Sequence, residues 1–368
     1  MDKVVDIFLD MVKVDSESGK ERKFADYVKT LFEIPDVEII EDRKSMDKTG
    51  SDAPNLIIHV PAKGSDKPAI GLSAHLDTVV PGIDIRPKVS DGVITASGDT
   101  ILGADDKSGI AAIYHALIRI MEDGMDRREA YIVLTTSEEI GLLGAKNLDV
   151  TLLNGLKDMV VFDSSGKFGT VVVSAPSQNS IKMKIKGRPA HAGLEPEKGL
   201  NAIMAGAQGL AQLEIGRIDH ETTCNIGVIK GGRATNIVAD ELIIEGEVRS
   251  LSEEKLEKVT HNIVSTMEKH VRQTGCSIET EVVHEYSSYN TPDTSMLLQD
   301  VLKAGELMGV DFVKGSTGGG SDTNIHNSNG LNAVNVSTGM QNPHTLEEYI
   351  EIDDLVKTRD FVINLLTK

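Results

Sequence analysis

The hydrophobic pattern predicts two amphipathic helices at the start of the chain, followed by strands that alternate with helices. Apolar residues recur at helical spacing within residues 4–12 and 24–31, as one face of a helix requires. Runs rich in Val, Ile and Leu then alternate with helical segments, an order typical of a layered α/β sheet. The expected strands are 55–60, 69–74, 130–136 and 159–162, and the expected helices are 107–121 and a short one after Glu139.

A second pattern occupies the middle of the chain. Between residues 177 and 286 the expected order is β-α-β-β-α-β, the split arrangement of ferredoxin-like folds. Its strands are expected at 180–186, 224–230, 241–249 and 277–284, and its helices at 200–213 and 253–273. This order forms a compact unit by itself, so the segment is expected to be an inserted domain.

The first pattern resumes beyond the insertion, with helices at 295–308 and 353–366 and a short strand at 333–336. A chain of 368 residues exceeds the usual size of one hydrophobic core. We therefore expect an α/β domain with a mixed sheet and helices on both faces, built from residues 1–176 and 288–368. The ferredoxin-like domain, residues 177–287, interrupts it.

Charge and cysteine content exclude several classes of protein. The net charge of −19 argues against a nucleic-acid partner, because phosphate binding needs clustered Lys and Arg. Cys224 and Cys276 form no C-x-x-C pair, so two buried free thiols are expected rather than a disulfide framework. Asp and Lys interrupt the apolar N-terminal residues, and no stretch is long enough to span a bilayer. A cytoplasmic protein without a membrane partner is the expectation.

Acidic residues and a histidine stand at the ends of successive predicted strands. His75 and Asp77 follow the second strand, Glu138 and Glu139 the third, and Asp163 the fourth. Catalytic groups in open α/β sheets gather at the carboxyl ends of the strands. Each group alone has an ordinary explanation, such as a hydrogen-bonded turn or an exposed acid, so the combination carries the prediction.

Two further motifs extend this set. Asp105 opens the helix at 107–121 within GADDKSG, where it could otherwise cap the helix, and His344 lies in NPHTLEE, where a lone histidine is usually exposed. Zinc accepts histidine nitrogen and carboxylate oxygen, and a site for two metal ions needs a bridging carboxylate. The absence of cysteine from the set favours a catalytic over a structural metal site.

These motifs have the order and spacing of the co-catalytic zinc exopeptidases. The matching stretches are SAHLDTV, GADDKSGIA, TSEEIGLLGAK, VFDSSG, GRPAHAG, GGRATNIVAD, GGGSD and NPHTLEE. Over essentially its whole length the chain resembles this superfamily, which includes peptidase T, aminoacylase, glutamate carboxypeptidase and succinyl-diaminopimelate desuccinylase. The peptidase T branch is the most similar, through GADDKSG, the Phe-Asp pair and the GGGSD loop.

The resemblance implies two divalent metal ions per chain, zinc in these relatives. By position, Asp105 corresponds to the bridging ligand. His75 and Asp163 complete one metal site, and Glu139 and His344 complete the other.

The resemblance also implies catalytic roles. Glu138 matches the general base, which takes a proton from the attacking water and hands it to the leaving amine. Asp77 matches the residue that orients His75. The peptide bond between Asp105 and Asp106 is expected to be cis, as in relatives.

Substrate contacts are implied in the remaining motifs. His191 matches a histidine of the inserted lid domain that helps to hold the oxyanion. Arg249 and Asn236 match residues that bind a substrate carboxylate, aided by the backbone amides of Gly319 and Gly320. Relatives often pair through the inserted domain, although some are monomers, so the resemblance leaves a homodimer and a monomer open. A short peptide is the expected substrate.

Asp163 indicates the direction of attack. The matching position is Asp in aminopeptidase-type members and usually Glu in carboxypeptidase and deacylase types, so an aminopeptidase acting first on tripeptides is expected. The alternatives are a carboxypeptidase or N-acyl-amino-acid deacylase with the same metal chemistry. A catalytically dead binding protein would lack Glu138 or a ligand, and every such position is present. An acidic metal-storage or interaction protein would not explain carboxylates placed at strand ends.

Overall fold

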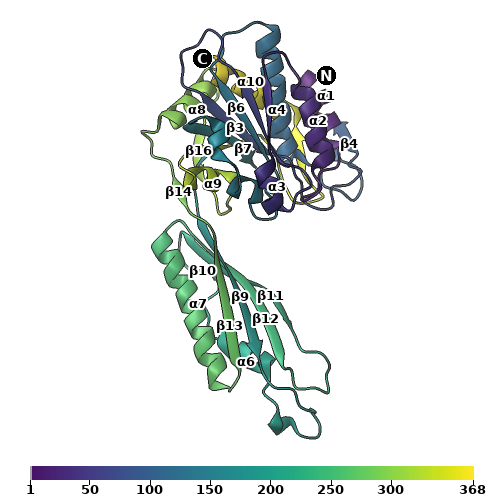
Figure 1. Cartoon of the computed structure of the whole chain (residues 1–368), viewed down its shortest axis with the longest axis vertical. Coiled ribbons are helices and arrows are strands. Elements are labelled where there is room, and N and C mark those ends of the chain that lie inside the picture. The colour runs from purple at the N-terminus through teal and green to yellow at the C-terminus, as the bar shows by residue number, and fades with distance from the viewer. Residues whose placement is uncertain (1) are drawn as a thin grey trace. The chain divides into compact units, whose positions relative to one another are not determined.

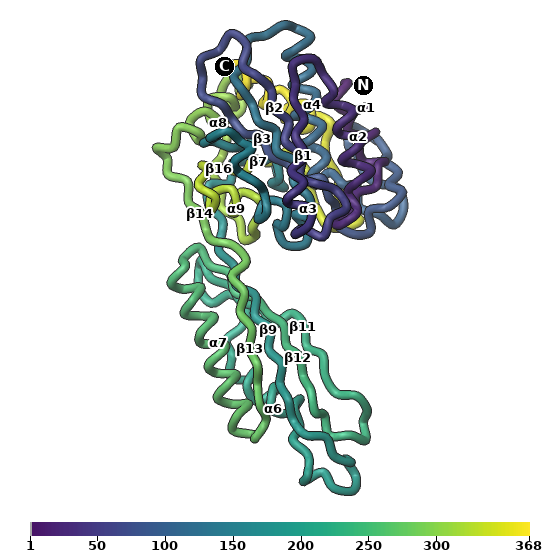
Figure 2. Tube along the Cα trace, in the orientation of Figure 1, coloured from purple at the N-terminus to yellow at the C-terminus, as the bar shows by residue number. Residues whose placement is uncertain are grey.

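A computed structural model describes residues 2–368, and the chain divides into two compact units. The larger unit holds the described residues up to Val173 together with Asn290–Ser316 and Ser321–Lys368. The inserted unit holds Ser174–Tyr289 and, from further along the chain, Thr317–Gly320. Figure 2 shows that the purple N-terminal and yellow C-terminal segments both belong to the larger unit.

A nine-stranded mixed sheet forms the centre of the larger unit (Figure 1). Its core strands β6, β3, β7 and β16 run parallel to one another, and β2 joins β6 antiparallel. In spatial order the strands are β1 (Glu38–Asp42), β2 (Asn55–Val60), β6 (Ala130–Thr135), β3 (Ile70–His75), β7 (Asp158–Ser164), β16 (Asn332–Ser337), β8 (Thr170–Ala175) and β14 (Tyr289–Asn290), with β15 (Val313–Ser316) paired to β8. The predicted mixed α/β sheet is confirmed.

The central strands are buried on both faces because alternate residues pack into two separate cores. In β6, Ile132 and Leu134 belong to the main core, whereas Tyr131 and Val133 belong to a second cluster. Continuous apolar strands of this kind require helices on both sides of the sheet. The helices of the larger unit are α1 (Lys3–Val12), α2 (Arg22–Phe32), α3 (Arg43–Thr49), α4 (Ala104–Glu122), α5 (Leu143–Lys146), η1 (Val150–Leu153), α8 (Met296–Glu306), α9 (Asp322–Ser328) and α10 (Ile352–Thr367).

A small three-stranded sheet lies beside the main one. It consists of β4 (Pro87–Ser90), β5 (Val93–Ala96) and β17 (Tyr349–Glu351). Gln341 and Tyr349 pair across the loop that leads into β17. This pairing closes the loop that contains His344, and the hydrophobic pattern gave no sign of it.

The inserted unit is a five-stranded antiparallel sheet with two helices packed against it. The spatial order is β10-β11-β12-β9-β13, and the β-α-β-β-α-β order of its main elements is the predicted one. Its elements are β9 (Ser177–Lys186), η2 (Pro196–Lys198), α6 (Ala202–Leu210), β10 (Gly216–Arg217), β11 (Thr222–Gly231), β12 (Glu241–Ser250), α7 (Glu253–Gln273) and β13 (Ser277–Tyr286). Cys224 and Cys276 are buried free thiols, as predicted.

Within residues 2–368, no helix combines the length and the apolar character that crossing a membrane requires.

Candidate active site

Three neighbouring strands of the large sheet bring four of the predicted site residues to one edge. Strand β3 lies between β6 and β7 and runs parallel to both. His75 is the last residue of β3, Glu138 and Glu139 follow β6, and Asp163 is the next-to-last residue of β7. Because parallel strands end at the same edge of a sheet, residues far apart in the sequence meet there.

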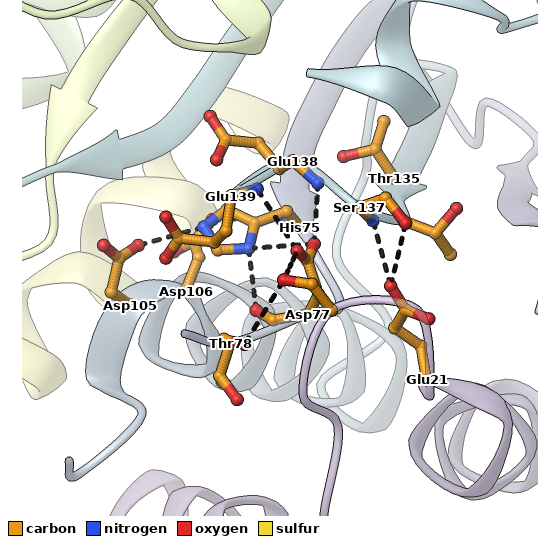
Figure 3. Close-up of polar contacts among 12 residues, drawn as sticks. Glu21, His75, Asp77, Thr78, Asp105, Asp106, Thr135, Ser137, Glu138 and Glu139 are labelled. Carbon is orange, nitrogen blue, oxygen red and sulfur yellow. Dashed lines mark hydrogen bonds and ion pairs between the residues drawn. The ribbon is translucent and has the colours of Figure 1, made fainter. Parts of the chain in front are cut away.

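Asp105 lies between the two histidines of the site. Its Oδ1 is 3.0 Å from Nε2 of His75, and its Oδ2 is 3.2 Å from Nε2 of His344. Nε2 of His75 also lies 3.6 Å from Oδ1 of Asp163, and Nε2 of His344 lies 2.9 Å from Oε1 of Glu139. Figure 3 shows the imidazole of His75 facing Asp105. The five residues therefore form two groups that share the Asp105 carboxylate.

The spacing of these atoms suits divalent cations. In each group the candidate ligand atoms lie within 4.8 Å of one another. Bonds of about 2.0–2.2 Å in a tetrahedral site place neighbouring ligand atoms roughly 3.4 Å apart, close to the contacts between the histidines and the carboxylates. Imidazole nitrogen and carboxylate oxygen are donors that zinc and similar metals accept. The donor set and its spacing both fit metal binding.

The balance of charge at the site also favours cations. Burial, with the nearby charge of Asp105, raises the pKa of Asp163 to about 8. Burial, with the charge of Asp163, raises the pKa of Glu138 well above its usual value. Contacts with Asp105 and Glu139 raise the pKa of His344 to about 10. Ionising these buried carboxyl groups together is therefore unfavourable, and bound cations would offset their mutual repulsion.

His75 is held in the orientation that a metal ligand needs. Its Nδ1 lies 2.9 Å from the backbone carbonyl oxygen of Asp77, and a carbonyl can only accept a hydrogen bond. Nδ1 therefore carries a proton, so Nε2 is the ring atom that would bind a metal ion. The carboxylate of Asp77 is further away, with Oδ1 at 3.6 Å from Nδ1. Asp77 orients His75 mainly through its main chain.

The carboxylate of Asp77 binds backbone amides elsewhere in the site, which the sequence did not suggest. Its Oδ1 accepts a hydrogen bond from the backbone N–H of Glu138 at 2.9 Å, and its Oδ2 accepts one from Glu139 at 3.2 Å. Ser18 Oγ donates to the same Oδ2 at 2.7 Å. Asp77 therefore links the ends of β3 and β6 and fixes the backbone that carries both glutamates (Figure 3).

Glu348 supports Asp105 in a similar way. Its Oε2 accepts hydrogen bonds from the backbone N–H groups of Leu102 and Gly103 at 2.7 and 2.8 Å, and its Oε1 accepts one from Asp105 at 3.0 Å. The next peptide bond, from Asp105 to Asp106, is cis, as the resemblance implies. Sequence reasoning missed Glu348, because its partners are backbone amides about 245 positions away.

The two histidines differ in exposure. The His75 side chain is 1% exposed, whereas that of His344 is 52% exposed. His344 has a φ of 64° and lies in the loop that the pairing of Gln341 with Tyr349 closes. One side of the candidate site is therefore open to solvent.

The residues predicted to contact substrate all lie in the inserted unit, in two groups. Exposed residues His191 and Asn236 are neighbours, since the N–H of Ala192 donates to the carbonyl of Asn236 at 2.9 Å. Arg249 lies beside the segment that contains Gly319 and Gly320. Its Nη1 donates to the carbonyl of the preceding glycine, Gly318, at 3.3 Å.

These two groups lie at opposite ends of the inserted sheet. Glu241, at the start of β12, pairs with Lys186, and His191 follows five residues later in a loop that pairs with Ile237. Arg249 lies near the other end of β12. Arg249 lies eight positions along the strand from Glu241, which corresponds to about 26 Å. His191 and Arg249 of one chain are therefore too far apart to contact the same short peptide.

Arg249 also has a partner that the sequence did not reveal. Its Nε and Nη2 donate to Oε1 and Oε2 of Glu247, each at 3.0 Å. Such a paired contact fixes the plane of the guanidinium group.

Two family descriptions match parts of this chain. The peptidase dimerisation domain (M20_dimer) matches residues 177–275, which lie in the inserted unit. Peptidase family M28 matches residues 55–184, a segment that includes His75, Asp105 and Asp163.

Three proteins are similar over nearly the whole chain. The uncharacterized protein YqjE of Bacillus subtilis (strain 168) is 36% identical over 365 residues, which cover 99% of this chain and 97% of that protein. The crystal structure of an aminopeptidase, PepT, from Bacillus cereus ATCC 10987 has 37% identity and a TM-score of 0.90, with 99% and 97% of the two chains covered. That of a tripeptidase from Staphylococcus aureus subsp. aureus Mu50 has 34% identity and a TM-score of 0.94, with the same coverage. The similarity therefore extends over both units.

Proposed function

This chain belongs to the peptidase T-like co-catalytic exopeptidases of the M20 family, and we propose that it removes the N-terminal residue from tripeptides in the cytoplasm, using two zinc ions. It is a metal-dependent peptidase of the tripeptidase or aminopeptidase type.

The observation that carries the proposal is the position of Asp105. Each of its carboxylate oxygens faces a different histidine, at 3.0 and 3.2 Å. We assign His75 and Asp163 to one ion and Glu139 and His344 to the other, with Asp105 shared. When bound there, two divalent cations would supply Lewis-acid chemistry, by lowering the pKa of water and polarising the substrate carbonyl.

Glu138 is proposed as the general base. It is not among the five proposed ligands, and the hydrogen bond from its backbone N–H to Asp77 fixes the main chain that carries its carboxylate. Only 7% of the residue is exposed, and burial raises its pKa well above the usual value. A raised pKa suits a carboxylate that takes a proton from the attacking water and delivers it to the leaving amine.

Substrate binding is assigned to both groups in the inserted unit. The guanidinium group of Arg249, with the backbone amides of Gly319 and Gly320, would bind the C-terminal carboxylate of a tripeptide. Asn236 would contribute from the other group, and His191 would donate a hydrogen bond to the developing oxyanion.

The separation of these groups supports a homodimer. A tripeptide spans only about 10 Å, whereas the two groups of one chain are separated by most of the length of strand β12. If both contact the same substrate, the two groups must come from different copies of the chain. Exposed apolar side chains in the inserted unit, including Leu194 at 75%, Met204 at 56% and Ile229 at 54%, are available for such pairing.

Blocking the substrate N-terminus tests the proposed direction of attack. A free tripeptide is expected to yield its N-terminal residue and a dipeptide, because Asp163 occupies the position typical of aminopeptidases. The same tripeptide with an acetylated N-terminus is expected to remain intact. Mass spectrometry of both digests gives the answer. The tripeptide with an amidated C-terminus is the matched control, because it lacks the carboxylate that Arg249 is proposed to bind.

Efficient cleavage of the acetylated peptide would move the protein to the deacylase or carboxypeptidase alternative. Metal-loaded protein is also tested on a set of di-, tri- and tetrapeptides. If it cleaved none of them, a catalytically dead binding protein would replace the aminopeptidase assignment as well as the deacylase or carboxypeptidase alternative.

A further inference from the structure

The four backbone amides that follow strand β6 are each bound by a buried side chain. Over residues 136–139, the N–H groups donate in turn to Asn55 Oδ1 at 3.0 Å, Glu21 Oε1 at 3.0 Å, Asp77 Oδ1 at 2.9 Å and Asp77 Oδ2 at 3.2 Å. The hydrogen-bond ladder of the strand ends at Thr135, and beyond it these side chains hold the backbone in place. The last two amides belong to Glu138 and Glu139, the proposed base and a proposed ligand.

Glu21 reaches this turn from the beginning of helix α2. It is completely buried, and its Oε1 also accepts hydrogen bonds from Ser137 Oγ at 3.2 Å and from the N–H of Gly19 at 2.9 Å. Its Oε2 accepts one from Ser51 Oγ at 2.5 Å. Four donors surround one carboxylate, and Figure 3 shows it directed toward Ser137.

The side chain of Glu21 does not cap helix α2. Ser18 and Glu21 have the spacing of a capping box, yet Glu21 forms no side-chain hydrogen bond that caps α2. Its contacts instead join Ser137 to the segment around Gly19 and Ser51. Helix capping therefore does not explain why the carboxylate of Glu21 is buried against a distant turn.

Ser137 is the residue whose conformation needs support. Its φ of 54° is in the left-handed region, which side chains disfavour because Cβ approaches the backbone. Both the N–H and the hydroxyl of Ser137 contact Glu21. The left-handed turn at Ser137 determines the direction in which the chain enters Glu138 and Glu139.

We propose that Glu21 is a positioning residue for the reaction: its carboxylate holds Ser137 in the left-handed conformation and so places Glu138 and Glu139 at the metal site. The proposal rests on the function proposed above for the part that concerns turnover. The contact with Ser137 and its effect on the turn can be tested separately.

Three variants distinguish positioning from simple stability. Glu21→Ala removes both hydrogen bonds that Ser137 donates to Glu21. Glu21→Gln keeps an oxygen that accepts from Ser137 and Gly19, and its amide can donate to Ser51. Val28→Ala is the matched control, because Val28 is a buried residue of the same helix α2 in the main hydrophobic core, and its side chain has no group that could bind the amides of the turn.

The variants are compared as metal-loaded protein, well below the melting temperature of each. For Glu21→Ala we expect kcat on a tripeptide to fall about 10-fold to 10²-fold, with KM and metal content little changed, because small displacements of reacting groups are costly. We expect Glu21→Gln to keep most of the wild-type kcat. Val28→Ala should lower the melting temperature and leave kcat unchanged.

Hydrogen exchange of the peptide that covers residues 135–140 provides a readout without turnover. Glu21→Ala should speed exchange there relative to the wild type, whereas Val28→Ala should not. Unchanged kcat together with unchanged exchange in Glu21→Ala would overturn the proposal, whatever happens to its melting temperature. If the wild-type protein cleaved no peptide, the proposed function would fail by itself, and hydrogen exchange would still decide whether Glu21 holds the turn.

Discussion

Replacing Glu138 by Ala is expected to lower kcat by about 10²–10⁴ while the protein keeps its full content of metal. The effect is large because Glu138 is the only residue proposed to move the proton from the attacking water to the leaving amine. Its side chain is not a proposed ligand, so metal binding should not depend on it. Steady-state kinetics on a tripeptide, together with elemental analysis of the same sample, measures both quantities.

Two further variants sharpen this test. Glu138→Gln has nearly the same volume and cannot accept the proton, so its kcat should be as low as that of Glu138→Ala. Glu139→Ala removes the oxygen that lies 2.9 Å from Nε2 of His344, so its metal content should fall as well as its activity. Near-normal turnover by Glu138→Gln, or loss of metal from it, would show that Glu138 has been assigned the wrong role.

His191→Ala is expected to lower kcat by about 10²–10³, with metal content unchanged and KM altered far less. Nδ1 of His191 accepts a hydrogen bond from the N–H of Gly193 at 3.2 Å, so the neutral ring carries its proton on Nε2. Nε2 is then a donor for the oxyanion, an interaction that is strongest in the transition state. His220→Ala is the matched control, because His220 is another exposed histidine of the inserted unit, with 81% of its side chain accessible.

Mixing variants decides which chain supplies His191. If it acts across a dimer, a hybrid of His191→Ala and Glu138→Ala chains contains one complete site, and the mixture should recover roughly a quarter of wild-type activity. Recovery requires that the subunits exchange, which labelled chains can confirm. No recovery after proven exchange would mean that His191 acts within its own chain, and loss of metal from His191→Ala would make it a ligand.

Much of the fold could be predicted because its strands and helices are strongly patterned. Helix α7 begins and ends at the residues that the pattern indicates, since its apolar stripe is regular and Ser252 caps its first turn. Strand β2 is likewise found at the expected residues. The short elements escaped prediction: α9 is only seven residues long, and β17 pairs with a strand about 250 positions away. Such elements are set by tertiary contacts rather than by local pattern.

The proposed metal ligands His75 and Asp163 were predictable because each lies at the end of an apolar strand. His75 and Asp163 meet in the structure at 3.6 Å, and His344 lies 3.2 Å from Asp105. The surrounding support was not predictable. Glu348 binds three backbone amides, and such partners carry no side-chain signature in a sequence.

Asp77 illustrates the same limit at closer range. Sequence reasoning assigned it to His75, two positions away, and its backbone carbonyl does contact Nδ1 of His75. Its carboxylate instead binds the amides of Glu138 and Glu139, some 60 positions away. The motif points to Asp77, whereas only the fold shows that its backbone carbonyl and its carboxylate contact different residues.

The metal content of the active protein tests the central claim most directly. Chelation should give an inactive protein, and titrating it with zinc should restore tripeptide hydrolysis in step with binding, up to two ions per chain. Cobalt and manganese should also restore activity, because all five proposed ligands are nitrogen or oxygen donors. Elemental analysis and turnover are measured on the same samples. Full activity with fewer than one metal ion per chain would contradict the proposed site.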